Sequence, residues 1–372
     1  IPKAAASLDG NQSIETAYEF TRRLQTPVED DLLAWYRLDE LQGSRIVDHS
    51  GRMRHATYAE IDASTSNQNG QVDASSSSGT YNRWKAFDND FTTSDGRWLA
   101  RQNQLNQPDG VYIRYDFDQP TIIGSYGITN QHYLIENRSP RSWTLQASSE
   151  PDSNYTVLHT VNGESGWGVR ETRHYQVDTI GAYQYYKLVF TEASGTDTWL
   201  ALQEIEFFPA PTYSKGKFGK AIDLNGEYFD MPIKADQETD SNGLSVAVWM
   251  YPRQVSGGFD NEKTIFSTDN NGFDWSTTIR FGAIQIWNGN YREQTPLTLV
   301  ENRWYHLVSS FDPSNSRINI YLNNQPVSLN TIGFDSSTDF IRLGRDDHTT
   351  GRSFDGLLDD VRVWGRPLSS AE

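Results

Sequence analysis

A loop rich in oxygen-bearing side chains runs from Lys85 to Trp98. Between the apolar pair Ala86-Phe87 and Trp98 it holds three aspartates, one asparagine, two threonines and one serine. Side-chain and backbone oxygens in such a loop can converge on one point, as a hard cation such as calcium requires. The loop therefore predicts a calcium site, and it favours a rigid β-sandwich that binds a ligand over an enzyme. The alternative is an Asp- and Asn-rich turn that holds no metal.

The composition limits the class of protein. The 372 residues are enough for two domains. A formal net charge of −17 argues against nucleic acid and anionic membranes as partners. No run of about 18 apolar residues occurs, so no membrane insertion is expected. The absence of cysteine excludes disulfides and thiolate metal sites, and it favours an exported bacterial protein that is extracellular or on the cell surface.

The two ends of the chain indicate that it is part of something larger. Residues 1–31 are expected to be a leader or linker, with a short helix over 13–26 that Ser13 would cap. The last residues, 368–372, resemble the start of a helix. We therefore expect the chain to be covalently part of a larger multidomain protein.

Short apolar and aromatic runs, separated by Gly, Pro, Asn and Asp, predict an almost entirely β protein. Hardly any segment has the 3.6-residue period of a helix. Extended structure is expected over 32–58, and a polar linker or long loop over 63–79. The further strands are expected at 111–117, 121–129, 142–148, 155–161, 172–177, 183–191, 201–208, 218–224, 229–231, 244–251, 263–267, 277–287, 295–300, 304–311, 317–322, 340–343 and 354–364.

Two separated parts of the chain resemble one family. The stretch 33–58 is similar to the opening of a laminin-G-like, concanavalin A-type jelly roll, and its usual continuation appears only at Gly216–Gly226. The later landmarks of that family follow in order at residues 244–252, 302–308, 320–323 and 354–364. The resemblance covers roughly 32–60 and 212–372, so about 150 residues separate the first hairpin from its sheet.

The intervening residues resemble a different family. Trp84–Asp90 with Trp98, then Arg138–Ser148, then Leu202–Phe208, are similar in type and order to a discoidin-like module. That is the coagulation-factor C-type, galactose-binding-like fold, which includes carbohydrate-binding module family 32. Together the two resemblances imply an all-β chain of two β-sandwich or jelly-roll domains. A galactose-binding-like domain (63–211) would be inserted into a discontinuous laminin-G-like jelly roll (32–62 and 212–372), as loop tips tolerate.

The discoidin resemblance implies the calcium ligands. In that family the ion ties the Asp-rich loop to a Glu near the last strand. The matching positions supply two carboxylates, one hydroxyl with its carbonyl, and three backbone oxygens: Asp88 and Glu204, Thr93, and Lys85, Asp90 and Gln203. Asn89 stands where the family usually has Gly, and Asn also tolerates left-handed backbone. Such a calcium is structural and does not normally touch the sugar.

A second ion is a further possibility in the laminin-G-like domain. It would use Asp39 or Asp48 together with Asp359 or Asp360. The alternative is a set of hydrogen-bonded carboxylates at the end of the sandwich.

The discoidin resemblance also implies a sugar site, in loops beside the calcium loop. An aromatic face and a few fixed polar groups would recognise the ring. The candidates by position are Tyr81, Arg101, His132, Tyr133, Asn137, Arg138, Trp167 and Trp199. Trp167, between two glycines, is expected to be an exposed platform, whereas Trp84, Trp98 and Trp143 are expected in the core. Loops at 257–261, 271–275 and 287–292 could form a second glycan or protein surface.

Catalytic signatures are lacking. The Glu-x-Asp-x-(x)-Glu strand of glucanases does not occur, and Glu204-Ile205-Glu206 comes nearest. Gly-x-Ser-x-Gly, His-Glu-x-x-His and phosphate loops are also missing. His306 is expected to be structural. The sequence thus favours a non-catalytic, calcium-stabilised carbohydrate-binding unit with a glycan or polysaccharide partner. The alternatives are an adhesion or spacer module that contacts protein, and a lyase or glycosidase with an unfamiliar site.

Overall fold

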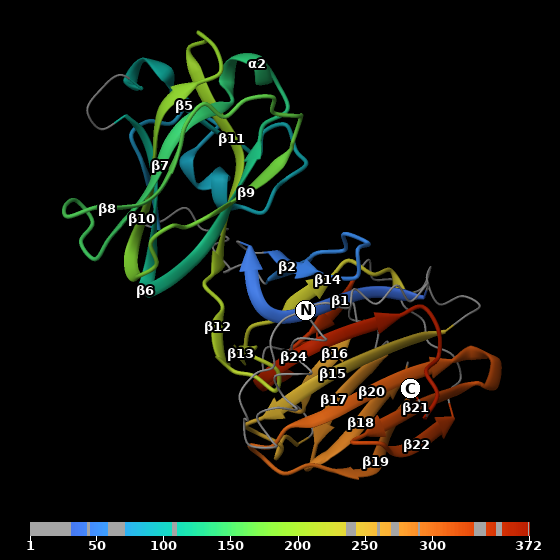
Figure 1. Cartoon of the computed structure of the whole chain (residues 1–372). Coiled ribbons are helices and arrows are strands. Elements are labelled where there is room, and N and C mark those ends of the chain that lie inside the picture. Colours follow the sequence, from blue (N-terminus) through green and yellow to red (C-terminus); the bar gives the residue numbers. More distant parts are fainter. Residues whose placement is uncertain are drawn as a thin grey trace, which may run out of the picture. The chain divides into compact units, whose positions relative to one another are not determined.

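The computed structural model describes residues 31–42, 45–58, 71–105, 110–235, 243–258, 261–268, 275–288, 291–330, 340–346, 352–370 and 372 (Figure 1). The helix expected over 13–26 and the boundary expected at 62 and 63 lie outside these residues. So do parts of the loops at 257–261, 271–275 and 287–292. Among the described residues, no helix is long and apolar enough to cross a membrane.

The chain divides into two compact units. Unit 2 is the continuous segment Glu60–Ala210, and unit 1 consists of Ile1–Ala59 and Pro211–Glu372. In the described parts each unit is built on its own antiparallel sheet, with only short helical turns beside it. The all-β expectation is therefore confirmed.

The unit 1 sheet takes strands from both of its segments. Its main path is β19-β18-β17-β16-β23-β14-β3-β2-β1-β24-β15-β20-β21-β22, and β13 adds to β24 while β12 pairs with β13. The bounds are β1 (Leu32–Gln42), β2 (Arg45–Asp48), β3 (Ala56–Tyr58), β12 (Thr212–Lys215), β13 (Lys220–Asn225), β14 (Phe229–Met231), β15 (Leu244–Pro252), β16 (Lys263–Ser267), β17 (Ser276–Arg280), β18 (Ala283–Asn288), β19 (Tyr291–Thr298), β20 (Tyr305–Asp312), β21 (Arg317–Leu322), β22 (Gln325–Asn330), β23 (Ile341–Leu343) and β24 (Asp355–Trp364).

The first strands pair with strands from the far end of the sequence. β1 lies beside β24, with Leu32 opposite Trp364 and Tyr36 opposite Val361. β3 lies beside β14, with Tyr58 opposite Phe229. Side chains that alternate along these strands point into one large apolar core. Burial of this core, at about 25 cal/mol per Å² of apolar surface, holds the two segments in one unit.

Two strand expectations in unit 1 were wrong. Residues 277–287 form a hairpin, β17 and β18, because Phe281 and Gly282 adopt φ values of +48° and +73° and turn the chain. β22 was not expected, and it follows β21 through a two-residue turn of Asn323 and Asn324, whose φ values are +48° and +65°. Asn favours such left-handed turns in hairpins.

Unit 2 contains a sheet ordered β5-β11-β6-β10-β7-β8, with β4 and β9 also pairing with β6. Its elements are β4 (Val72–Ala74), η1 (Arg83–Phe87), β5 (Trp98–Arg101), η2 (Gln102–Gln104), β6 (Val111–Asn130), α2 (Ile135–Arg138), β7 (Pro140–Ser148), β8 (Thr156–Val161), β9 (Thr172–Gln176), β10 (Ala182–Ala193) and β11 (Trp199–Pro209).

The long strand β6 joins two layers of unit 2. Its first half pairs with β10 and β4, and its second half pairs with β11 and β9. The two strands expected at 111–117 and 121–129 are therefore one. Aromatic side chains fill the space between the layers. Trp98 and Trp143 are 0 % and 1 % exposed, as expected, and Trp84 is a partly buried neighbour of this core.

Candidate functional site

The Asp-rich loop is held at both ends by the core of unit 2. It leaves the short turn η1, whose Ala86 and Phe87 are buried, and it returns into β5 at the buried Trp98. Asn89 has φ +55°, which confirms the left-handed backbone expected there. Both ends of the loop are therefore anchored in the core of unit 2.

Asp90 organises the inside of the loop. Its Oδ1 accepts hydrogen bonds from the backbone N–H of Thr92 at 3.0 Å and of Thr93 at 2.8 Å, and both threonine hydroxyls also bond its carboxylate. Burial alone would raise the pKa of Asp90, but the hydrogen bonds from Thr93 and Thr92 outweigh it and lower that pKa to about 2. The Asp90 carboxylate therefore serves as an acceptor for the loop's own donors.

Gly96 completes this loop by leaving room for the Asp90 carboxylate. A Cβ at Gly96 would lie 2.5 Å from Asp90 Oδ2 and 2.9 Å from Thr93 Oγ1. These separations are far below ordinary van der Waals contact. Lys85 Nζ closes the far side by donating to the Asp95 carbonyl at 2.5 Å.

Strand β11 presents Gln203 and Glu204 to the loop, and both are 0 % exposed. Gln203 Nε2 donates to the carbonyl oxygens of Asp90, at 2.7 Å, and Thr93, at 3.1 Å. The sequence predicted a role for the Gln203 backbone oxygen, but the structure also shows its side chain tying the loop to the sheet. On the same buried amide, Gln203 Oε1 has no hydrogen-bond partner among the described residues.

The Glu204 side chain is one of the groups that influence the pKa of Asp88, so the two carboxyl groups are near one another. Burial raises the pKa of Asp88, and the charge of Asp90 raises it further, while the Asp90 backbone N–H, Lys85 and Glu204 lower it. Two carboxylates in a buried place require a shared proton or a cation.

The donor set fits a hard cation. Two carboxylates, a buried amide oxygen, the Thr93 hydroxyl and nearby backbone carbonyls are the oxygen ligands that calcium accepts. In the part of the chain that is described, no three His, Cys, Asp or Glu side chains gather as a metal site. A calcium ion at this loop would therefore rely on neutral oxygens as well as Asp88 and Glu204.

Near the end of the loop, Arg97 contacts two of the predicted ligand-binding residues. This side chain is 6 % exposed, and its guanidinium lies 4.4 Å from the centroid of the Tyr81 ring. Its Nη1 donates to the Ser94 carbonyl and lies 3.5 Å from His132 Nδ1. Arg97 was not among the site residues predicted from the sequence.

Two further arginines brace aromatic rings at the same loops. Arg138, at the end of α2, forms an ion pair with Asp197 and lies 5.6 Å from the Tyr133 ring centroid. Arg101, at the end of β5, lies 4.9 Å from the Trp199 ring centroid.

Gln102 ties the segment that holds Asn137 to the start of β11 at Trp199. Its Nε2 donates to the carbonyl oxygens of Asn137, at 2.9 Å, and Trp199, at 2.8 Å. The loop-end rim is defined here as Tyr81, Arg97, Arg101, His132, Tyr133, Asn137, Arg138, Asp197 and Trp199. It contains every ligand-binding residue predicted from the sequence except Trp167.

The rim is positively charged on an acidic protein. Burial lowers the pKa of His132, and the charges of Arg97 and Arg170 lower it further. Burial likewise lowers the pKa of Arg97, and the positive charge of Arg138 lowers it further. The ordinary pKa of His is about 6.5, so His132 is neutral at pH 7 and can both donate and accept hydrogen bonds.

Trp167 is not the exposed platform that the sequence predicted. It is 6 % exposed, its Nε1 donates to the Pro140 carbonyl at 2.9 Å, and the Arg173 guanidinium lies 4.3 Å from its ring centroid. Glu164 and Glu171 hold Arg173 over the ring at 2.5 and 2.8 Å. The flanking glycines have no side chains that could cover the ring, but Arg173 on β9 covers it instead.

The four carboxylates considered for a second metal each accept a hydrogen bond or form an ion pair within unit 1. Asp48 accepts hydrogen bonds from the backbone N–H of Trp35 and Ser50, at 2.9 and 2.8 Å. Asp360 accepts one from the Trp35 indole at 2.6 Å, Asp359 accepts one from the Phe218 backbone at 2.8 Å, and Asp39 lies 3.6 Å from Arg37. These hydrogen bonds match the alternative of hydrogen-bonded carboxylates, and the second ion stays a prediction.

Comparisons with known proteins add fold-level similarity. No curated protein matches the chain. Domain 4 of AbnA, an extracellular arabinanase of Geobacillus stearothermophilus solved with arabinotriose, is 23% identical over 44% of this chain and 78% of its own, with a TM-score of 0.35. The family 32 module of NanJ from C. perfringens, solved with galactose, is 14% identical over 37% of this chain and 91% of its own, with a TM-score of 0.30.

A two-domain protein also matches over most of the chain. Truncated AlyQ, with a family 32 module and an alginate lyase domain, is 13% identical over 83% of this chain and 99% of its own, with a TM-score of 0.33. Residues 225–372 match the model of the concanavalin A-like lectin/glucanases superfamily. The similarity to that superfamily lies wholly within unit 1.

Proposed function

We propose that this chain is a non-catalytic, calcium-stabilised carbohydrate-binding unit of a larger exported protein, and that unit 2 binds a glycan at the loop-end rim. The observation that supports this most is the set of arginine-braced aromatic rings at the rim. Contacts link Tyr81 through Arg97 to His132, and link Tyr133 through Arg138 to Asp197.

Such a surface has the chemistry of sugar recognition. Aromatic rings pack against the C–H face of a sugar, and fixed donors and acceptors bind its hydroxyls. Tyr133 is 54 % exposed, so its ring is accessible to a ligand. The guanidinium groups hold the rings in place and keep N–H groups at their edges, so little order has to be created on binding.

Calcium would act on the loop next to the rim. The ion would bind the carboxylates of Asp88 and Glu204, and further oxygens of the loop would complete its coordination shell. Arg97 and Trp98 end this loop, so the position of the loop determines where Arg97 lies against Tyr81 and His132. Calcium is thus proposed to stabilise the rim without contacting the sugar.

A glycan array, probed with the full chain with and without a chelator, tests this proposal. We expect binding that His132→Ala and Trp199→Ala each reduce by about tenfold or more, as removal of a central contact does. Tyr155→Ala is the matched control, because Tyr155 also lies under a cation, Lys187 Nζ at 3.7 Å, but away from the rim.

Two outcomes would reject the proposal. Binding to no glycan, with retention of a protein partner instead, would indicate an adhesion or spacer module. Release of oligosaccharide or unsaturated product from a polysaccharide by the purified chain would show catalysis and remove the non-catalytic part of the proposal.

A further inference from the structure

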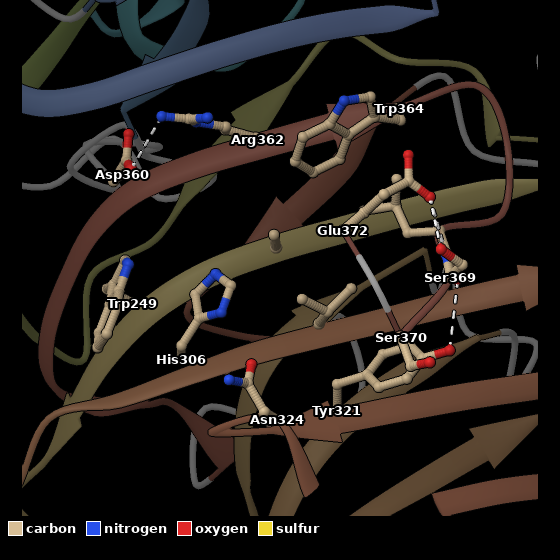
Figure 2. A pocket seen from close by; sticks show the side chains of 13 residues that line it. Trp249, His306, Tyr321, Asn324, Asp360, Arg362, Trp364, Ser369, Ser370 and Glu372 are labelled. Atoms are coloured by element: carbon tan, nitrogen blue, oxygen red, sulfur yellow. Dashed lines mark hydrogen bonds and ion pairs between the residues drawn. The ribbon is translucent and has the colours of Figure 1, made fainter. Parts of the chain in front are cut away.

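A cavity of about 460 Å³ opens on the outer face of the unit 1 sheet, the face that points away from the large core (Figure 2). Alternation along the strands explains the position. On β15, Val246 and Val248 belong to the core, whereas Ala247 and Trp249 line the cavity. The volume lies within the range of small-molecule sites, about 300–1,000 Å³.

Strand register explains why the sheet is hollowed here. Across four neighbouring strands the outward positions run Arg362, Ala247, Val308 and Tyr321, and each pairs with the next. The two small residues lie in the middle, and the two large ones lie at the ends. The floor is therefore low in the centre and is bounded by a guanidinium and a phenol.

An aromatic wall stands beside this floor. Trp249 on β15 pairs with His306 on β20, and their rings stack with centroids 4.9 Å apart and planes inclined by 34°. Phe218 meets the edge of Trp249 at 5.6 Å, and Lys217 Nζ lies 4.8 Å from its ring centroid. The wall is thus rigid, and Trp364 lies toward the opposite side of the cavity (Figure 2).

The polar groups at one end are fixed by their own network. The Trp35 indole donates to Asp360 Oδ1 at 2.6 Å, and Arg362 Nη2 donates to Asp360 Oδ2 at 3.3 Å. The Arg362 guanidinium also lies 4.9 Å from the Trp35 ring centroid. Its Nε is buried and has no hydrogen-bond partner among the described residues.

A hairpin turn supplies polar groups at the other side. Asn323 Oδ1 accepts a hydrogen bond from the His306 backbone N–H at 2.9 Å, so the turn is tied to β20. The next residue, Asn324, has φ +65° and lines the cavity. Figure 2 shows the side chains of Asn324 and His306 directed toward the cavity.

The walls carry no excess charge. Arg362 is paired with Asp360, and Glu372 Oε1 lies 2.7 Å from Arg366 Nη2. Burial lowers the pKa of His306, and Arg362 lowers it further against the opposing effect of Asp360. The imidazole is therefore neutral at pH 7. This differs from the rim of unit 2, where arginines outnumber the carboxylates.

We propose that this outer-face cavity is a second carbohydrate site, which binds an uncharged sugar segment with its C–H face against the aromatic wall that Trp249 and His306 form together. Hydroxyl groups would bond to His306, Asn324 and Arg362. This goes beyond the function proposed above, because it places an independent site of different charge in unit 1. A chain with both sites would hold a glycan at two points and gain avidity.

The test uses the full chain with the rim disabled by the double substitution His132→Ala/Trp199→Ala. Isothermal titration calorimetry with neutral gluco-, galacto-, manno-, xylo- and arabino-oligosaccharides is expected to show one remaining site for at least one of them. Ala247→Leu, which fills the floor, and His306→Ala are each expected to weaken that site by about tenfold or more. Asn319→Ala is the control, because Asn319 lies on the same strand as Tyr321 but outside the cavity.

Two results would overturn this inference. One is that no neutral oligosaccharide binds the rim-disabled chain, and the other is that both cavity variants bind as well as their parent. Melting curves of each variant show whether it is folded. Ala247→Leu adds volume and His306→Ala removes a side chain, so either variant alone tests the cavity if the other does not fold. If the rim substitutions change nothing while Ala247→Leu abolishes binding, the rim proposal fails and the cavity proposal stands.

Discussion

Substitution of Gly96 by Ala tests the idea that the Asp-rich loop is an architectural support. The added methyl would lie 2.5 Å from Asp90 Oδ2 and 2.6 Å from Asp90 Cγ. The carboxylate would have to retreat by about 1 Å to reach ordinary contact. That movement lengthens its hydrogen bonds from the N–H groups of Thr92 and Thr93, now 3.0 and 2.8 Å.

The magnitude follows from these contacts. Hydrogen bonds to a charged group contribute about 1.5–3 kcal/mol each when buried, and Asp90 is only partly buried. The gain from a less flexible unfolded chain, about 0.4–1 kcal/mol for Gly to Ala, opposes this loss. We expect the free energy of unfolding of unit 2 to fall by about 1–2 kcal/mol, and its melting temperature by about 3–6 °C.

Differential scanning calorimetry measures this change, and calcium titration should show weaker binding because the loop oxygens move. Gly258→Ala is the matched control, since the nearest atom to its added Cβ is 3.5 Å away and the position has no positive φ. The control should change the melting temperature by no more than about 1 °C. An unchanged melting temperature and calcium affinity in Gly96→Ala would refute the reasoning about the loop.

Three more expectations concern unit 2. Burial raises the pKa of Glu206 from 4.5 to about 7, so its contribution to stability is present below pH 4.5 and is lost as the pH rises through 7. The loss is about 3 kcal/mol at most, and Glu206→Gln should flatten the fall in melting temperature between pH 5 and pH 8; a slope equal to that of the parent would contradict this. A chelator should lower the melting temperature of unit 2, and Glu204→Gln should remove that effect; melting curves insensitive to both calcium and chelator would argue against the ion. Trp167→Ala should cost about 3–5 kcal/mol of stability and leave glycan affinity per folded molecule unchanged. Trp199→Ala should instead weaken glycan binding and leave stability nearly unchanged.

Much of the fold could be predicted from the sequence because the strand pattern is local. β14, β16 and β21 begin and end at the residues expected, since alternating apolar side chains and flanking turn residues mark them. The errors occur where one residue decides the backbone. Phe281 takes a left-handed conformation that its residue type does not indicate, so the hairpin of β17 and β18 was read as a single strand.

The candidate site was predictable only in part, because contacts between residues on different elements cannot be seen in the sequence. Side chains near one another in sequence, such as Asp88 and Asp90, could be selected from their spacing. Trp167 was misjudged because the side chain of Arg173, on β9, covers its ring. Arg97 was missed because a lone arginine beside an Asp-rich loop carries no signal, and only the folded chain places it between Tyr81 and His132.

The outer-face cavity could not have been predicted at all. Its floor depends on register between four strands, and register becomes visible only when the pairing of β24, β15, β20 and β21 is known. His306 was expected to be a structural histidine. It does stack on Trp249, and its ring also faces a cavity.

The pairing of β1 with β24 also determines how the chain can acquire its structure during synthesis. Leu32 cannot pair with Trp364 until the residues between them have been synthesised, so β1 lacks its β24 partner while Glu60–Ala210 emerges. Unit 2 has all of its strands in one continuous segment and can fold during that time. Once folded, it shortens the flexible loop that unit 1 must close, which lowers the entropic cost of joining its two segments. The inserted unit thus acts as a folding aid for the protein that contains it, apart from any ligand that either unit binds.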